Sequence, residues 1–227
     1  MEQLLNLGDK RQTGFCCYCG RGTETRDHVP SKVFLDEPYP TNLPVAFACQ
    51  SCNESFSLDE EYLACLIECV VCGIVDHKAV ERKKISSILQ RKPALVSRLK
   101  QAQKESDKGL LFSAELLRVK NVLLKLARGH AVYELNEPQL DDPVRFNCAP
   151  LIMMDPVMRD SFEAMPKSVV FPEVGSRASQ RLVVSDPGLV LWMTVQPGRY
   201  RYLVFAGAGV TVRIVIREYL ACEIGWE

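Results

Sequence analysis

The chain has 227 residues, with 28 basic and 28 acidic side chains, so its formal net charge at pH 7 is zero. Apolar residues make up 47% and charged residues 25% of it, which is ordinary for a globular protein and excludes an intrinsically disordered chain. Because a neutral chain has no overall field that attracts nucleic acid, any such affinity has to come from local basic patches.

The sequence shows no sign of membrane insertion or of secretion. The N-terminus lacks the basic start and the long apolar core of a signal peptide. The apolar run from Leu63 to Val75 is interrupted by Glu68, and is shorter than the roughly 18 uncharged residues that a membrane helix needs. Ten cysteines could form disulfides in a secreted protein, but four have metal-site spacing and most others lie in apolar stretches. We therefore expect a cytoplasmic protein without a membrane partner.

Two C-x-x-C pairs dominate the first quarter of the chain. Cys16 and Cys19 form the first pair, and Cys49 and Cys52 form the second. Each pair makes a tight turn that presents two sulfurs, and four thiolates suit tetrahedral Zn²⁺. The spacer exceeds the roughly 15–20 residues of a plain zinc ribbon, so an insert is expected between the pairs. Cys17 is expected to stay outside the site, since it cannot face the same ion as both neighbours.

The insert carries the dipeptide Asp27-His28, followed closely by Pro30. Imidazole has an unperturbed pKa near neutrality, which suits a base that takes a proton from water. Carboxylate and amide oxygens suit Mg²⁺, which keeps several waters and needs few protein ligands. Adjacent residues of a strand point to opposite faces, so Asp27 and His28 would reach a metal and a water from different sides unless the strand ends there. Pro30 favours such an ending. An Asp-His pair alone is often only a hydrogen bond.

In combination, the order C-x-x-C, D-H-V-P, N-L and C-x-x-C-N resembles that of the HNH endonucleases, whose ββα-metal motif is often stapled by a four-cysteine zinc. The resemblance implies that Asp27 and Asn53 hold one catalytic divalent ion. It also implies that His28 is the general base and that Asn42 orients its ring. Two features depart from the family: the last ligand is Asn53 rather than a histidine, and the glycines that often follow the D-H-x-x-P segment are missing.

The function implied is a metal-dependent endonuclease that hydrolyses nucleic-acid phosphodiester bonds, with DNA favoured over RNA. Its cofactors would be structural Zn²⁺ and catalytic Mg²⁺ or Mn²⁺. One alternative is a non-catalytic zinc module that binds nucleic acid or a protein partner. Another is a nuclease effector that a partner activates, as in bacterial defence systems that use related domains.

Beyond the cysteine pairs, a short buried strand is expected at residues 45–48 and a helix from Asn53 onward, with an apolar stripe at helical spacing. Three cysteines on this helix fit a hydrophobic core better than a second metal site. Glu60 could join the outer shell of the metal, although an acid near a helix N-terminus is favoured by the helix dipole alone. The cysteines in question are Cys65, Cys69 and Cys72.

Residues 78–108 hold ten basic and three acidic side chains, a surplus of seven positive charges. Their periodicity predicts two helices divided by Pro93. The basic face is either a phosphate track or an ordinary solvated surface, and charge alone leaves both readings open. A further amphipathic helix is expected over residues 113–128, with Gly129 as its stop signal. Lys125 would extend the basic character, and His130 would be a structural residue at the helix end.

After Glu137, prolines punctuate short strand-like segments without a catalytic cluster, which predicts an antiparallel meander. This part could shape the substrate groove, form a homodimer or dock a regulatory protein partner. The expected fold is therefore α+β: a zinc-stapled ββα motif, a middle helical segment and a C-terminal β-rich region. The corresponding boundaries are 1–77, 78–134 and 135–227, and the expected C-terminal strands are 182–184, 190–195, 200–205 and 210–216.

Overall fold

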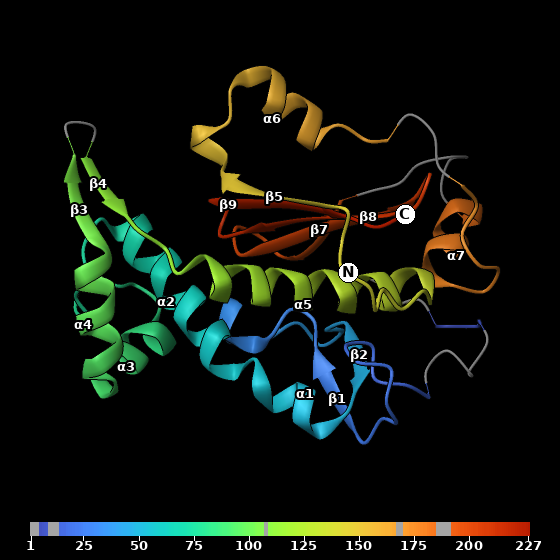
Figure 1. Cartoon of the computed structure of the whole chain (residues 1–227), viewed down its shortest axis with the longest axis horizontal. Helices are drawn as coiled ribbons and strands as arrows, with labels where there is room; N and C mark the ends of the chain where they lie inside the picture. The colour runs from blue at the N-terminus through green and yellow to red at the C-terminus, as the bar shows by residue number, and fades with distance from the viewer. Residues whose placement is uncertain (1–4, 9–13, 107–108, 167–169, 185–191) are drawn as a thin grey trace.

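A long central helix organises the fold. The structure is a computed structural model that describes residues 5–8, 14–106, 109–166, 170–184 and 192–227. Helix α5 (Leu116–Leu135) lies between a five-stranded sheet and the cysteine-rich N-terminal part (Figure 1). Helices are mixed with antiparallel sheets, so the predicted α+β class is confirmed.

The N-terminal part is a small hairpin followed by a helix. Strands β1 (Thr25–His28) and β2 (Val45–Ala48) pair antiparallel, and α1 (Gln50–Ser55) begins two residues after β2. The predicted strand at 45–48 is thus confirmed. The connection between the strands is irregular apart from one short 3-10 helix, η2 (Lys32–Phe34), as its prolines predict.

Helix α2 (Ser57–Cys72) follows α1 and buries one side in the core. Cys65 and Cys69 are both fully buried among apolar side chains. In the part of the chain that the structure describes, neither belongs to a cluster that could hold a metal ion, so the core interpretation is supported. The helix ends at Gly73, whose φ of 71° is the left-handed conformation that glycine adopts without strain.

The basic segment forms helices α3 (Lys83–Arg91) and α4 (Pro93–Ala102), as predicted, with Pro93 at the start of α4. Proline is well tolerated there, because the first turn of a helix has no partner for its amide. A hairpin of β3 (Gln103–Ser106) and β4 (Gly109–Phe112) follows. It was not predicted, since its first strand is polar and lacks an alternating pattern.

The predicted end of the next helix is wrong. Helix α5 continues through Gly129 to Leu135, and Asn136 caps it in the left-handed conformation at a φ of 63°. Gly129 instead marks a close approach between the helix and the hairpin: a Cβ there would lie 2.6 Å from Cγ2 of Val29. The glycine is therefore explained by packing rather than by helix termination.

The C-terminal sheet has the strand order β5-β9-β8-β7-β6. Strands β6 to β9 form an antiparallel meander, of which β6, β7 and β8 correspond to predicted strands, and β5 pairs with β9 at one edge. Neither β5 nor β9 was predicted. The bounds are β5 Arg145–Pro150, β6 Met193–Gln196, β7 Tyr200–Ala206, β8 Val210–Ile216 and β9 Leu220–Gly225.

The strand predicted at 182–184 is wrong, because these residues end helix α7 (Arg177–Val184). A run of only three apolar residues does not distinguish a helix from a strand. Of the strand predicted at 190–195, residues 190 and 191 lie outside the described residues, and β6 begins at Met193. A 3-10 helix, η3 (Leu151–Met153), and helix α6 (Pro156–Glu163) connect β5 to the following segment.

Helix α5 packs on the sheet through His130, which is completely buried. Its ring stacks on Tyr202 with the ring centroids 3.7 Å apart, and its Nε2 lies 2.8 Å from the hydroxyl of Tyr200. Burial lowers the pKa of His130 well below its ordinary value, so the ring is neutral. His130 is structural, as expected, but it lies inside the helix rather than at its end. Among the described helices, none combines the length and hydropathy needed to cross a bilayer.

Candidate metal centre and adjacent hairpin

Four cysteines converge at the N-terminal end of the hairpin. The Sγ atoms of Cys16, Cys19, Cys49 and Cys52 all lie within 4.8 Å of one another. The first pair sits on a tight turn in which the amide of Gly20 donates to the carbonyl of Cys16 at 2.8 Å. The second pair spans the start of α1, with Cys49 as its N-cap residue. The predicted four-cysteine set is therefore brought together by local structure at both ends.

The geometry of this cluster fits a tetrahedral ion. In a ZnS₄ site with Zn–S bonds of about 2.3 Å, neighbouring sulfurs are about 3.8 Å apart. The Sγ atoms of Cys19 and Cys49 are 3.7 Å apart. A hydrogen bond from the hydroxyl of Ser51, together with the backbone amide of Cys52, lowers the pKa of Cys49 to about 6. A thiolate is the form that binds metal, so the four residues could hold an ion such as zinc.

Cys17 is adjacent to this cluster but does not belong to it. Its side chain is 1% exposed, and burial raises its pKa to about 12. Its backbone amide donates to the carbonyl of Phe47 in β2 at 3.0 Å. The residue thus remains a neutral thiol that anchors the turn to the hairpin, in agreement with the prediction that it is not a ligand.

Asp27 points into the protein and lies in a buried polar cluster. Its Oδ2 accepts a hydrogen bond from the hydroxyl of Tyr18 at 2.8 Å and lies 2.8 Å from Nζ of Lys125 on α5. The ammonium group also contacts a carboxylate oxygen of Glu60 and lies 2.8 Å from the hydroxyl of Ser31. All five side chains belong to buried residues. We call this set, Tyr18, Asp27, Ser31, Glu60 and Lys125, the Lys125 cluster.

The Lys125 cluster has two carboxylates for one ammonium. Such a group is tolerated in an interior only when its members are paired and hydrogen-bonded. Here the contacts of Asp27 and Glu60 with Lys125 meet that requirement. The cation nearest to Asp27 among the described residues is thus an amine supplied by the chain itself. A divalent ion at Asp27 would have to bind mainly through Oδ1, because Oδ2 is already engaged.

His28 ends β1 and is half-buried. Neighbouring residues of a strand point to opposite faces, so its ring does not share the Lys125 cluster with Asp27. Burial, helped by the charge of Lys32, lowers the pKa of His28, so the ring is neutral near pH 7 and can accept a proton. Its Nδ1 is buried and has no hydrogen-bond partner.

Asn53 lies on α1 and is half-buried against the same hairpin. Its Nδ2 donates to the hydroxyl of Thr25 at 3.1 Å. Because Thr25 and Asp27 are two residues apart on β1, they lie on the same face of the strand. The helix therefore places the amide of Asn53 on the face of the hairpin that carries Asp27, which is the side the resemblance requires.

Asn42 lies half-buried on the loop that leads into β2. It was predicted to orient the imidazole of His28. Since Nδ1 of that ring has no partner, the orienting hydrogen bond is not made at this nitrogen.

Sequence reasoning missed the importance of Lys125, which it treated as part of the basic surface. A signal was present: Lys125 lies three residues after Val122 and four before Gly129, within the apolar stripe of the helix. Lysine is almost never buried at such a position unless it forms an ion pair. Glu60 was noted only as an outer-shell candidate, and its partner could not be identified without the fold.

Comparisons with known proteins give no match from which a function could be transferred. No protein-family model matches it, and no curated protein or solved structure is significantly similar to it. The four-cysteine cluster, the hairpin and the helix that follows it are therefore the features that bear on function.

Proposed function

We propose that this chain is a metal-dependent endonuclease of the HNH type, with DNA as the favoured substrate. The observation that carries the proposal is the order of elements next to the cysteine cluster: β1 ending in His28, then β2, then α1 bearing Asn53. A strand-strand-helix order is what the sequence motif implies, and this order supports the proposal.

In this proposal His28 is the general base. It accepts a proton from a water molecule as that water attacks phosphorus and the bond from phosphorus to the leaving oxygen breaks. The half-buried ring and its lowered pKa support this role, because the neutral form has to be present at the working pH. Zn²⁺ at the four cysteines would serve structure alone.

The catalytic divalent ion, Mg²⁺ or Mn²⁺, would be held by Asn53 and by Asp27. When bound, it would stabilise the charge that develops on the leaving oxygen. Carboxylate and amide oxygens suit this class of ion, which keeps most of its own waters. Tyr18 and Lys125 would fix the carboxylate of Asp27 through Oδ2, leaving Oδ1 for the metal.

The test is plasmid cleavage with added Mg²⁺ or Mn²⁺, comparing the wild-type protein with His28→Ala. His77→Ala is a matched control, because His77 is also half-buried but lies in a loop after α2. We expect His28→Ala to abolish cleavage with unchanged zinc content and folding, and His77→Ala to cleave normally. Cleavage by His28→Ala at the wild-type rate would end the assignment.

A second candidate function is a non-catalytic zinc module that binds nucleic acid or a protein partner. One observation favours it: Lys125 already neutralises Asp27, which weakens the case for a divalent ion there. Retained DNA binding without cleavage, at any concentration of Mg²⁺ or Mn²⁺, would support the module and contradict the nuclease.

A further inference from the structure

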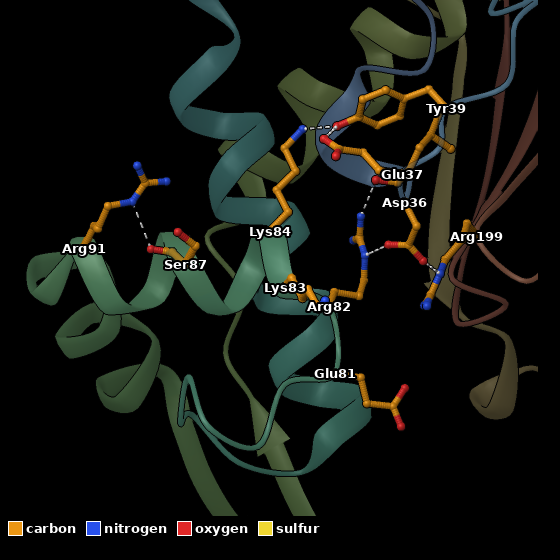
Figure 2. A pocket seen from close by; sticks show the side chains of 11 residues that line it. Asp36, Glu37, Tyr39, Glu81, Arg82, Lys83, Lys84, Ser87, Arg91 and Arg199 are labelled. Atoms are coloured by element: carbon orange, nitrogen blue, oxygen red, sulfur yellow. Dashed lines mark hydrogen bonds and ion pairs between the residues drawn. The ribbon is translucent and has the colours of Figure 1, made fainter.

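A charged cavity lies beside the hairpin, outside the site described above. Its volume is about 510 Å³, and it is bounded by the loop after η2, the start of α3 and the residue before β7 (Figure 2). This size is within the range of about 300–1,000 Å³ that is usual for ligand sites. Its lining includes five basic and three acidic side chains, so the chemistry of the cavity is that of an anion site.

The wall of the cavity carries a surplus positive charge. Among the lining residues, five basic side chains against three acidic ones leave a surplus of two positive charges. Behind them, the guanidinium groups of Arg82, Arg199 and Arg217 share the carboxylates of Asp36, Glu68 and Glu81. Arg82 is buried, with its side chain only 3% exposed. Nη1 of Arg199 is buried without a hydrogen-bond acceptor, 3.8 Å from Glu68.

The rim of the cavity adds cations where a helix begins. Lys83 and Lys84 occupy the first turn of α3, which has no acidic residue there and no side-chain cap. Lysines at this position are unfavourable for the helix dipole, whereas an anion is favourable. Arg91 extends the basic rim along the same helix. The carboxylates of Glu37 and Glu81 are exposed at the edge, where water screens them.

A row of basic side chains connects this cavity to His28. The ammonium groups of Lys32 and Lys84 lie 5.4 Å and 5.3 Å from the centre of the Tyr39 ring. Lys84 also donates to the hydroxyl of Tyr39 at 3.0 Å, as Figure 2 shows. The charge of Lys32 acts on His28. Positive charge thus continues from the end of β1 to the mouth of the cavity.

We propose that this cavity binds a backbone phosphate of a nucleic-acid strand that passes His28. The strand would follow Lys32 and Lys84 and place one phosphate against the first turn of α3, near Arg199. The identity of the ligand rests on the proposed function, whereas the anion chemistry of the cavity does not. A free phosphate compound has the same chemistry, so the experiment has to separate the two sources.

The experiment measures binding rather than cleavage, in the His28→Ala background without added Mg²⁺. A short fluorescent DNA duplex is titrated at several KCl concentrations between about 50 and 200 mM. The test variant combines Lys83→Ala, Lys84→Ala and Arg91→Ala. The matched control removes three exposed lysines of the same basic segment that do not line the cavity. These control substitutions are Lys78→Ala, Lys100→Ala and Lys104→Ala.

We expect the test variant to bind about tenfold more weakly, and its slope of log K against log salt to be smaller by about 1, because the three substitutions remove the cations that hold one phosphate. The control should change the affinity less than twofold. An equal loss of affinity in both variants would overturn the proposal, and so would a test variant that binds like its parent. Thermal melts establish that both variants are folded.

Two further outcomes separate this inference from the proposed function. If the wild-type protein never cleaves DNA but the slope differs as expected, the cavity stands and the nuclease assignment fails. If the wild type cleaves DNA and the slopes do not differ, only the cavity proposal fails. Calorimetry with inorganic phosphate tests the other source of the ligand. If the test substitutions abolish phosphate binding but leave the affinity for DNA unchanged, the cavity binds a free phosphate compound, and the proposal of a strand phosphate is wrong.

Discussion

The Lys125 cluster makes the sharpest prediction about stability. Replacing Lys125 by Met keeps the length of the side chain and removes its charge, which leaves Asp27 and Glu60 facing each other in the interior. Both residues are buried, at 6% and 8% exposure. Removing one partner of a buried ion pair typically costs about 3–5 kcal/mol, because the remaining charge is uncompensated.

The free energy of protonating a carboxyl group has a similar magnitude. The cheapest response of the variant is to protonate one carboxyl group. At pH 7, protonating a group with an ordinary pKa of about 4 costs about 4 kcal/mol, at 1.36 kcal/mol for each pH unit. We therefore expect Lys125→Met to lower the free energy of unfolding at pH 7 by about 3–5 kcal/mol.

Protonation of this carboxyl group also makes the stability of the variant depend on pH. In the variant, the folded protein would hold a carboxyl group whose pKa is raised above its unfolded value. Such a group stabilises the fold at low pH and loses that contribution as pH rises. The deficit of Lys125→Met should therefore shrink by about 2–3 kcal/mol between pH 7 and pH 5.

Urea denaturation of the zinc-loaded protein at both pH values measures these quantities. Lys120→Met is the control, because Lys120 lies on the same helix but is exposed, and surface substitutions usually stay within about 0.5 kcal/mol. If Lys125→Met is unfolded at pH 7, recovery of the fold at pH 5 provides the reading. A loss below about 1 kcal/mol, or an equal deficit at both pH values, would refute the reasoning.

Three further predictions follow from other contacts. Cys52→Ser should lower the zinc content from about one ion per chain to almost none, whereas Cys72→Ser on α2 should leave it unchanged. The measurement is the zinc that is released when the thiols are chemically modified, detected with a chromogenic chelator. His130→Phe should remove a pH dependence: wild-type stability should fall below about pH 6.5 by up to 1.4 kcal/mol per unit, because the buried neutral ring must stay uncharged, and thermal melts of the variant should lack that slope. Gly129→Ala should destabilise by about 1–3 kcal/mol through contact with Val29, despite a gain in helix propensity of about 1 kcal/mol, and Val29→Ala should relieve that loss in urea titrations of the double variant.

The parts of the site that follow from local chemistry could be predicted from the sequence. The convergence of the four cysteines was predicted correctly, because the C-x-x-C turn is a local structure that depends on spacing alone. Strand β2 and the division of α3 from α4 at Pro93 follow from residues that are neighbours in the chain. For the same reason strands β6, β7 and β8 of the meander were predicted, with turn signals between them.

What failed depends on contacts between distant segments. Gly129 was taken for a stop signal because its close neighbour, Val29, is a hundred residues away in the chain. Likewise, Lys125 looks like a surface residue until Asp27 and Glu60 are brought to it by folding. The acid in the D-H dipeptide was expected to face a metal ion, and only the packing of α5 shows that an amine lies against it.

Helix α5 packs against both the N-terminal hairpin and the C-terminal sheet, so the two parts share one core element and have no domain boundary between them. Lys125 and Gly129 touch the hairpin side, whereas His130 and Glu134 touch Tyr200 and Tyr202 on the opposite side. A truncated protein that ends after α5 would expose the face of the helix that packs on the sheet, so it should be less stable than the whole chain. Loss of the part that carries the four cysteines should likewise destabilise the C-terminal sheet, so we expect the two parts to unfold as a single cooperative unit.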